Sequence, residues 1–434
     1  MVENPKSFEE DRIESTSCGG CNPMFDPNIN TSSGRDVIYL NNAGQAWLDP
    51  DVQAVGRESV NYPPFVQPSA EISSKIRQSF AQLIQAQPKE IAIVPSTAFA
   101  ITMAAKNILR LCEKGKGHER NKILLLQDQM CSAVYPWQGI CDESEQSDYP
   151  LSLHIVPYPK DGSGWTDAVL SHLSAHANEI LVACLPPLHW SDGAIVDLSQ
   201  IDPVCRANRI LLVIDATQAV GIMPLNVQQL QPAMLACSIH KWLRGPSGAS
   251  LVYIDKSLFE TWSPLDQHGR SRDMKDGPSW ESYPNEMTTK GYPDKFLPDA
   301  RKFDGGGKPN PIILPMLQKS LEQVLERVNL HTCQSQLRTI VNPLLTWITA
   351  NPDRFEMPKS PHVYHLIGIR PTDGWLSVTQ MLKIAKTLQT DHQIFLAVRC
   401  GAFRISPYLN TTEHDMNEFV RIFDGVVTKF WSGR

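Results

Sequence analysis

The feature that most constrains this chain is a series of apolar segments that end on chemically reactive side chains. Residues 210–214 are an apolar, β-branched run that predicts a buried strand, and Asp215 follows it directly. A second apolar segment, 234–238, leads to Lys241, and a further strand is predicted over 249–254. Because open α/β sheets bind ligands at the carboxyl ends of their strands, we expect the acid and the lysine to face one crevice.

An acid and a lysine in one crevice suit a particular chemistry. A partly desolvated lysine loses some of its preference for the charged form and becomes an amine nucleophile. Pyridoxal phosphate (PLP) chemistry uses such a pair, because the lysine carries the cofactor as a Schiff base and the acid keeps the pyridine nitrogen protonated. Alone, Asp215 would be explained as a strand-end cap and Lys241 as a loop lysine, but the two together favour a cofactor site.

The motifs around these two residues carry a family resemblance. They read V-I-D-A-T-Q-A-V-G and S-I-H-K-W-L-R-G-P. Together they resemble the class V aminotransferase family of fold-type I PLP-dependent enzymes, nearest its isopenicillin N epimerase-like and cysteine desulfurase-like branch. The resemblance implies that Lys241 is the Schiff-base lysine, Asp215 the partner of the pyridine nitrogen and Gln218 the neighbour of the ring hydroxyl. Ser238 and His240 would hold the cofactor phosphate.

A second phosphate contact is predicted at the start of a helix. Residues 90–94 read as a strand, and an apolar helix is predicted over 98–109 after a short Ser-Thr turn. Helix N-termini attract anions through their free N–H groups and their dipole, although Ser and Thr there also serve as plain N-caps. The resemblance assigns Ser96, Thr97 and Ala98 to the cofactor phosphate.

Two further cofactor contacts depart from the family pattern. The resemblance aligns Met130 with a ring-stacking aromatic or His residue, so that its thioether either packs on the ring or is ordinary core. It aligns Gly307, in R-K-F-D-G-G-G-K-P-N, with a hydroxyl residue that reaches the partner subunit's phosphate in these dimers. Gly307 would contribute only its backbone N–H, and a plain glycine turn is the alternative.

Substrate contacts are predicted at three places. The segment Y-L-N-N-A-G resembles the one that the family lays over its active site, which assigns Asn42 and Ala43 to the substrate, with a simple turn as the alternative. His189 and Trp190 follow a predicted strand, where they contact the substrate or ring, or serve as packing residues. The R-I-S-P-Y-L-N-T motif aligns Arg404 with the family's carboxylate-binding arginine, because a guanidinium grips a carboxylate with two hydrogen bonds.

The expected architecture follows from the alternation of strands and helices between residues 90 and 254, which predicts a mostly parallel sheet with helices on both faces. The resemblance covers about residues 36–425 and implies the α/β fold of fold-type I PLP-dependent transferases, with a seven-stranded-type large sheet and a smaller α+β C-terminal domain. The predicted parts are a tail over 1–35, a PLP-binding domain over 36–305 whose segment 36–68 crosses to the small domain, and the small domain over 306–434.

The composition argues against several classes of binding partner. The net charge of −6 and the lack of a basic stripe argue against nucleic acid. No apolar run approaches the roughly 20 residues that span a bilayer, and the polar, acidic N-terminus does not resemble a secretory signal, so we expect a cytoplasmic protein without a membrane partner. Cys18 and Cys21 form a CxxC pair without a second pair, so no metal site is expected.

The reaction is less constrained than the cofactor. Cysteine desulfurases need a nucleophilic cysteine on a mobile loop, whereas Cys400 stands only four positions before Arg404, which disfavours that activity. We expect action at the α carbon of an amino acid, as a lyase, epimerase or C–C bond-forming cyclase of specialised metabolism. The long, aromatic and Arg-rich segment 255–310 favours a substrate larger than a common amino acid.

Three alternatives stay open: a class V aminotransferase, a cysteine desulfurase or C–S lyase, and a non-catalytic PLP-fold binding protein. The complete set of Asp215, Gln218, His240 and Lys241 argues against the last. The resemblance also implies a homodimer with active sites at the subunit interface.

Overall fold

The computed structural model describes residues 37–63, 70–113, 120–159, 163–273, 293–307 and 309–431. The predicted tail over 1–35 and its CxxC pair lie outside the described residues, as do residues 274–292 and 308 of the aromatic segment 255–310. Within the described ranges, no helix is both long and apolar enough to cross a membrane.

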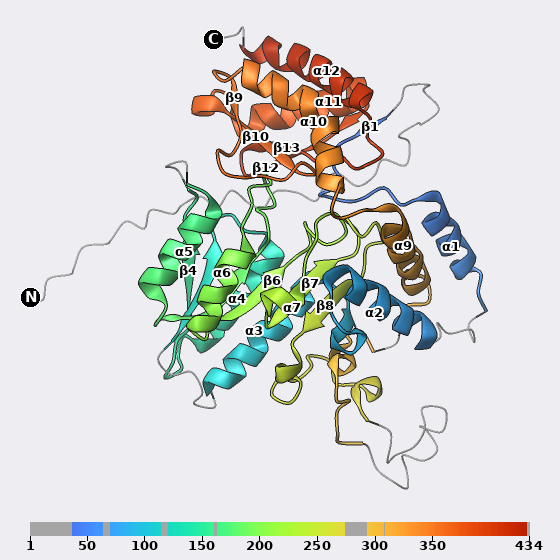
Figure 1. Cartoon of the computed structure of the whole chain (residues 1–434), viewed down its shortest axis with the longest axis vertical. Helices are drawn as coiled ribbons and strands as arrows, with labels where there is room; N and C mark the ends of the chain where they lie inside the picture. The colour runs from blue at the N-terminus through green and yellow to red at the C-terminus, as the bar shows by residue number, and fades with distance from the viewer. Residues whose placement is uncertain are drawn as a thin grey trace, which may run out of the picture. The chain divides into compact units, whose positions relative to one another are not determined.

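A seven-stranded sheet lies at the centre of the large α/β part (Figure 1). Its strands, in spatial order, are β2 (Ile91–Val94), β8 (Ser250–Ile254), β7 (Met234–Ser238), β6 (Leu211–Asp215), β5 (Ile180–Leu185), β3 (Lys122–Leu126) and β4 (Ser152–Val156). From β7 to β4 all neighbours are parallel, which confirms the mostly parallel sheet. Only β8 is antiparallel to both of its neighbours, β7 and β2. Antiparallel strands need no crossover helix, and β8 follows β7 through a loop alone.

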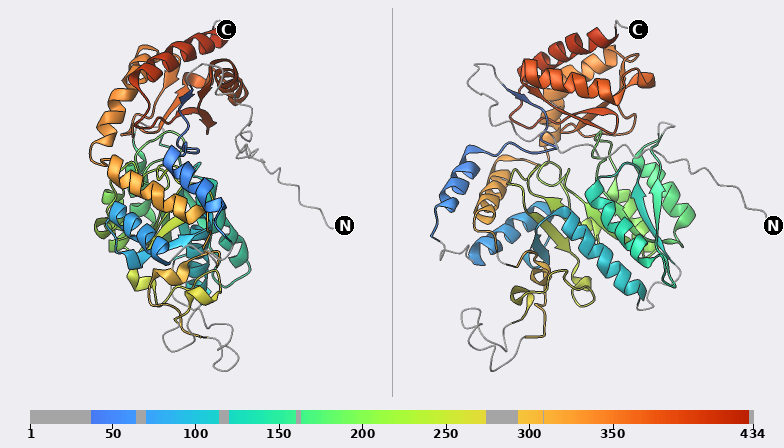
Figure 2. Two further views of the ribbon diagram at one scale, coloured as in Figure 1. Left: turned by 90° about the vertical axis from the view of Figure 1, so that its right-hand side faces the viewer. Right: turned by 180° about the vertical axis from the view of Figure 1, so that it is seen from behind.

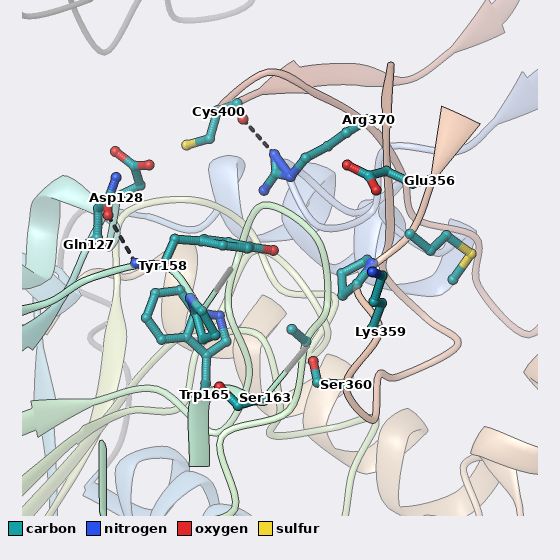
Figure 3. Close-up of a pocket in the computed structure, with 14 residues that line it drawn as sticks. Gln127, Asp128, Tyr158, Ser163, Trp165, Glu356, Lys359, Ser360, Arg370 and Cys400 are labelled. Carbon is teal, nitrogen blue, oxygen red and sulfur yellow. Dashed lines mark hydrogen bonds between the residues drawn. The ribbon is translucent and has the colours of Figure 1, made fainter. Parts of the chain in front are cut away.

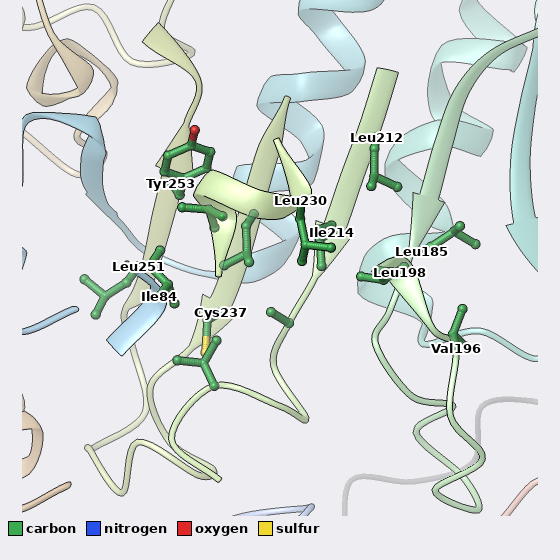
Figure 4. Close-up of a cluster of buried hydrophobic side chains, with 14 of the residues drawn as sticks. Ile84, Leu185, Val196, Leu198, Leu212, Ile214, Leu230, Cys237, Leu251 and Tyr253 are labelled. Atoms are coloured by element: carbon green, nitrogen blue, oxygen red, sulfur yellow. The ribbon is translucent and has the colours of Figure 1, made fainter. Parts of the chain in front are cut away.

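Helices cover both faces of this sheet because its side chains alternate between two apolar clusters. In β6, Leu212 and Ile214 join one cluster and Val213 joins the other. Figure 4 shows part of the first cluster, in which Leu198 and Leu230 pack near the β6 side chains. The first cluster includes residues of α2 (Ala70–Ile84), α5 (Trp165–His176), α6 (Leu198–Ala207), α7 (Val227–Leu230) and α9 (Ile313–Arg327), and the second those of α3 (Thr97–Glu113) and α4 (Tyr135–Ser144).

The C-terminal part is built on a four-stranded antiparallel sheet. Its order is β12 (Ala397–Arg399), β13 (Ala402–Ile405), β10 (Ile367–Pro371) and β9 (Phe355–Glu356). Three helices cover one of its faces, as the views in Figure 2 show: α10 (Cys333–Ala350), α11 (Val378–His392) and α12 (Glu413–Trp431). Their apolar side chains form a third cluster with the sheet residues Val398, Phe403, Ile405, Ile367 and Ile369. The other face of the sheet is not covered by these three helices.

The segment after the undescribed N-terminus reaches this C-terminal part. There β1 (Ile38–Tyr39) pairs in parallel with β11 (Ile394–Phe395), and α1 (Pro50–Val60) follows. By contrast, α9 packs against α1 and α2 and contributes to the core of the large sheet. The domain boundary at residue 305 stays a prediction. The first helix beyond that residue, α9, packs on the large sheet.

Candidate active site

Four hydroxyl groups from four segments meet at the start of α3. The Thr97 Oγ1 lies 2.7 Å from Ser238 Oγ at the end of β7, 3.2 Å from Ser250 Oγ at the start of β8 and 3.4 Å from Thr217 Oγ1. All four side chains are buried. Because the first N–H groups of α3 lack intrahelical partners, hydroxyls and amides together form a site that suits a phosphate.

The predicted acid and lysine lie on neighbouring strands. Asp215 ends β6, which pairs in parallel with β7, and Lys241 follows β7 by three residues. Asp215 is buried, and its Oδ1 accepts a hydrogen bond of 3.1 Å from the backbone N–H of Thr217. Its Oδ2 is then available to a ring nitrogen.

Burial, and secondarily the charge of Arg404, lower the pKa of Lys241 to about 8, although Asp215 opposes the change. Burial and the neighbouring Lys241 lower the pKa of His240 to about 4, so this imidazole is neutral at pH 7. The site therefore holds an amine that deprotonates near neutral pH, which is what a nucleophilic lysine requires.

Glycines allow the tight turn that carries Lys241. Gly221 has a φ of +94°, and a Cβ there would stand 2.6 Å from the carbonyl oxygen of Trp242. The N–H of Gly245 donates to the carbonyl of Ile239 at 2.8 Å and closes the turn.

Gln218 is the centre of a hydrogen-bond network beneath this turn. Its side-chain amide donates to the carbonyl of Ala43 at 3.0 Å, and its Oε1 accepts from the indole of Trp242 at 2.8 Å. Its backbone carbonyl lies 2.8 Å from His365 Nε2. Gln218 therefore ties the N-terminal segment to the Lys241 turn.

The N-terminal segment connects the lysine turn to the C-terminal sheet. The N–H of Ala46 donates to the carbonyl of His240 at 2.9 Å. Asn42 donates through its side chain to the carbonyl of Ser406, and the N–H of Ala43 donates to Ser406 Oγ, both at 3.0 Å. Residues 42–46 thus lie between β13 and the turn that carries Lys241.

Arg404, on β13, is a buried cation with weak partners. Arg404 is 2% exposed. Its Nη1 donates to the carbonyl of Trp190 at 3.3 Å, and its Nη2 donates to Asn41 Oδ1 at 3.4 Å. Its Nε has no hydrogen-bond partner, and no ion pair of Arg404 with an acid occurs among the described residues. Burial, followed by the charge of Arg399, lowers the pKa of Arg404 to about 9. A buried guanidinium with unused donors is poised for an anion.

His189 does not join these residues. It is fully buried, its Nδ1 lies 2.8 Å from Ser191 Oγ, and its Nε2 lies 3.1 Å from the carbonyl of Gln127. Its ring stacks on Trp165 at 5.1 Å between centroids. The structure therefore accounts for His189 as a packing residue, whereas Trp190 does lie against Arg404, 5.6 Å from ring centroid to guanidinium carbon.

The remaining predicted contacts have local explanations as well. Ser96 is exposed, and its Oγ caps α3 by accepting from the N–H of Phe99 at 3.0 Å. Met130 is half-buried in the turn after β3. Gly307 has a φ of +64°, and a Cβ there would meet no atom within 4 Å. Two residues earlier, a Cβ on Gly305 would stand 2.6 Å from Pro95, which precedes the start of α3.

Sequence reasoning missed several residues that the fold brings to the site. Thr217 lies inside the D-A-T-Q motif, so the motif itself was the available signal. Ser250 and Arg399 had no local signal, because only strand pairing places them here.

A separate cavity of about 390 Å³ has none of Asp215, Lys241 and Arg404 in its lining (Figure 3). Among its lining residues, the Arg370 guanidinium lies over the ring of Tyr158, 5.1 Å from ring centroid to guanidinium carbon, and Cys400 also lines it. Arg370 donates to the carbonyl of Cys400 at 2.7 Å, drawn as a dashed line, and to the buried Asp192 at 2.8 Å.

The donors present fit PLP. The hydroxyl cluster and the α3 N-terminus suit its phosphate, Asp215 Oδ2 its ring nitrogen and Lys241 its aldehyde. The family model described as aminotransferase class-V matches residues 54–298. The chain belongs to the class V aminotransferase family. It is accordingly a PLP-dependent enzyme with the fold-type I architecture.

Among curated relatives of this class V member, the uncharacterized aminotransferase YcbU of Bacillus subtilis is 31% identical over 189 residues, 43% of this chain and 46% of the relative. A probable cysteine desulfurase of Pyrococcus abyssi is 24% identical over 245 residues, 53% of this chain and 56% of the relative. The chain thus spans about half the length of these curated relatives.

Solved structures show the same fold over more of the chain. A C-DES mutant with glycine covalently linked to its PLP cofactor aligns with a TM-score of 0.73 and 17% identity, over 89% of this chain and 96% of that one. The cysteine desulfurase CsdA of Escherichia coli aligns with a TM-score of 0.72 and 18% identity, over 91% and 95%. At these identities the likeness concerns the fold.

Proposed function

We propose that this enzyme acts at the α carbon of an amino acid, with Lys241 as the cofactor lysine and Arg404 as the carboxylate-binding residue. The observation that carries the proposal is the buried Lys241, whose pKa of about 8 is set by burial and by Arg404. An amine of this pKa exchanges protons readily near neutral pH. Bound PLP would supply an electron sink for the pair of electrons left on the α carbon when its proton departs.

The chain's residues take distinct parts in this proposal. Thr97, Ser238 and the first amides of α3 bind the phosphate, and the neutral His240 adds a hydrogen bond rather than a charge. Asp215 holds the proton on the ring nitrogen. Lys241 Nζ removes the α proton and returns it. Arg404 orients the substrate through its carboxylate, and residues 42–46 cover the site from the side of β13.

The fate of the substrate after proton removal decides the reaction. We propose a lyase, epimerase or C–C bond-forming cyclase of specialised metabolism, with transamination as the first alternative. A homodimer and a cytoplasmic location also stay proposals that rest on the family resemblance. Light scattering tests the dimer, for which we expect twice the 48.5 kDa mass of the chain.

Cysteine desulfuration is the second candidate, favoured by the names of several relatives and structural neighbours. Against it, Cys400 and Gly401 are the two residues of the turn between β12 and β13, with φ values of +48° and +70°. Such a two-residue turn is fixed by the flanking strand pairs rather than mobile. The Cys400 side chain also lies at the cavity of Figure 3, beside Arg370.

The test of the proposal is the visible absorption spectrum of PLP-loaded protein. We expect a visible band that borohydride removes and that is absent or shifted in Lys241→Ala. The matched control is Lys383→Ala, on the exposed face of α11, which should leave the band unchanged. A wild-type protein that stays colourless with added PLP would refute the assignment.

A further inference from the structure

Arg244 closes the turn that carries Lys241, in a backbone conformation that arginine rarely adopts. Its backbone N–H donates to the carbonyl of Lys241 at 3.0 Å. Its φ is +54°, in the left-handed region that favours glycine. Arg244 is only 5% exposed, so its side chain is packed within the protein rather than extended into solvent. The contacts of its guanidinium account for an arginine at this position.

The guanidinium of Arg244 binds the segment that precedes α1. Its Nε and Nη2 donate to the two carboxylate oxygens of Asp49 at 3.3 and 3.1 Å, and Nη2 also donates to the carbonyl of Trp47 at 2.8 Å. The guanidinium carbon lies 4.2 Å from the ring centroid of the buried Tyr408. A planar group that is paired with a carboxylate and stacked on a ring has little freedom, so it holds its partners in place.

Asp49 binds Arg244 in place of its usual local partner. It is the N-cap residue of α1, where an aspartate side chain commonly accepts a hydrogen bond from the first turn of the helix. The side chain of Asp49 makes no such capping bond. Both of its carboxylate oxygens accept from Arg244, which is 195 residues away in the chain. The ion pair is therefore a tertiary contact between the start of α1 and the lysine turn.

The segment that Arg244 holds also lies on the turn of Lys241. The N–H of Ala46 donates to the carbonyl of His240 at 2.9 Å. Residues 46–49 are thus bound just before Lys241, at His240, and just after it, at Arg244. Water would reach the lysine more easily if this segment loosened, and the desolvation that lowers the pKa of Lys241 would then be smaller.

We propose that Arg244 is a positioning residue for Lys241, which limits the access of water to the lysine amine by fastening residues 46–49 over the turn. The inference rests on the proposed function, in which Lys241 is the cofactor lysine. It adds a residue that touches neither substrate nor cofactor and acts through the segment that it binds.

The effect of Arg244 runs through packing rather than through its charge. The titratable groups that interact with Lys241 include Arg404 of β13, Asp215 of β6, Cys237 of β7, Arg399 of β12 and the adjacent His240. Replacing Arg244 removes a positive charge and replacing Asp49 removes a negative one, so an action through space would move the lysine pKa in opposite directions. Loosening of residues 46–49 raises the lysine pKa in both cases.

The experiment measures the pH at which the rate of PLP uptake by apoprotein reaches half its maximum. It compares the wild type with Arg244→Gly, Asp49→Asn and the double variant. Glycine accepts the left-handed backbone of residue 244, and asparagine can still cap α1, so both variants should fold. We expect the midpoint to rise by at least about half a pH unit in each single variant, and no further in the double variant, because all three lose the same contact.

The matched control is Arg327→Gln, which removes an exposed ion pair with Asp51 near the same end of α1 and should leave the midpoint unchanged. Opposite shifts in Arg244→Gly and Asp49→Asn, or an unmoved midpoint in either one, would overturn the inference and leave the proposed function intact. A wild-type apoprotein that gains no visible band with PLP would refute the proposed function and this inference with it.

Discussion

At the scale of single residues, the environment of Lys241 decides what this site can do. An exposed lysine stays protonated at neutral pH, whereas burial and Arg404 bring the pKa of Lys241 from 10.5 to about 8. Asp215 works in the opposite direction and limits the change. Burial and a neighbouring positive charge also lower the pKa of Arg404, and both effects are relieved when a carboxylate binds to its guanidinium.

The first prediction concerns the pH dependence of cofactor uptake. Because the neutral amine is the reactive form, the rate at which apoprotein takes up PLP should rise with pH and reach half its maximum near pH 8. Removing a neighbouring positive charge raises a lysine pKa, so Arg404→Gln should move this midpoint to higher pH. Stopped-flow absorbance measures both, and Arg421→Gln serves as control. An unmoved midpoint in Arg404→Gln would show that Arg404 does not act on Lys241.

At the scale of elements, the turn between β12 and β13 is the feature on which our proposal against a loop-cysteine reaction rests. Left-handed backbone at Cys400 and Gly401 matches the twist of the paired strands and holds them close. Arg370 adds a hydrogen bond to the carbonyl of Cys400. The strand pair Arg399–Ala402 thus closes the turn, and the hydrogen bond from Arg370 holds its first residue.

The second prediction follows from this turn. Cys400→Ser should leave turnover of the amino-acid substrate within about twofold of the wild type, because a serine keeps the backbone and loses only the thiol. The measurement pairs substrate turnover with an assay of persulfide formed from cysteine. Loss of persulfide formation in Cys400→Ser alone would instead establish the desulfurase.

At the scale of the whole molecule, the two sheets are joined through the segment that contains Trp190 and Asp192. Asp192 is fully buried and binds Arg370 of β10, Tyr158 and the N–H of Ala194. A further apolar cluster, with Ala43, Leu188, Trp242, Leu337 and Leu366 among its members, crosses between the same parts. The position of Arg404 relative to Lys241 depends on these contacts.

The third prediction tests that connection. Asp192→Ala leaves the partly buried Arg370 without its carboxylate, so unfolding free energy should fall by about 3 kcal/mol. Glu418→Ala removes an exposed ion pair with Arg421 and should cost less than about 1 kcal/mol. Urea denaturation compares the two variants, and a similar small loss in both would show that the Asp192 contact does not hold the parts together.

The sequence by itself determined the local chemistry of this protein. Apolar β-branched runs specify strands, so the positions of Asp215 and Lys241 at strand ends could be inferred, and alternation of strands and helices indicated the parallel sheet. The hydroxyl residues Ser96 and Thr97 likewise signalled the start of α3, where free backbone N–H groups suit an anion.

Only the tertiary structure decided which distant residues share a face or a pocket. His189 carries the same local pattern whether it turns to the site or packs in the core, and only the tertiary structure shows that its ring stacks on Trp165. Ser250 reaches Thr97 because β8 runs antiparallel beside β7, and Arg399 joins Arg404 because of the register of β12 on β13. Alternation along a strand fixes two faces, but the partner strand and its register depend on burial of the whole core, which no short stretch of sequence contains.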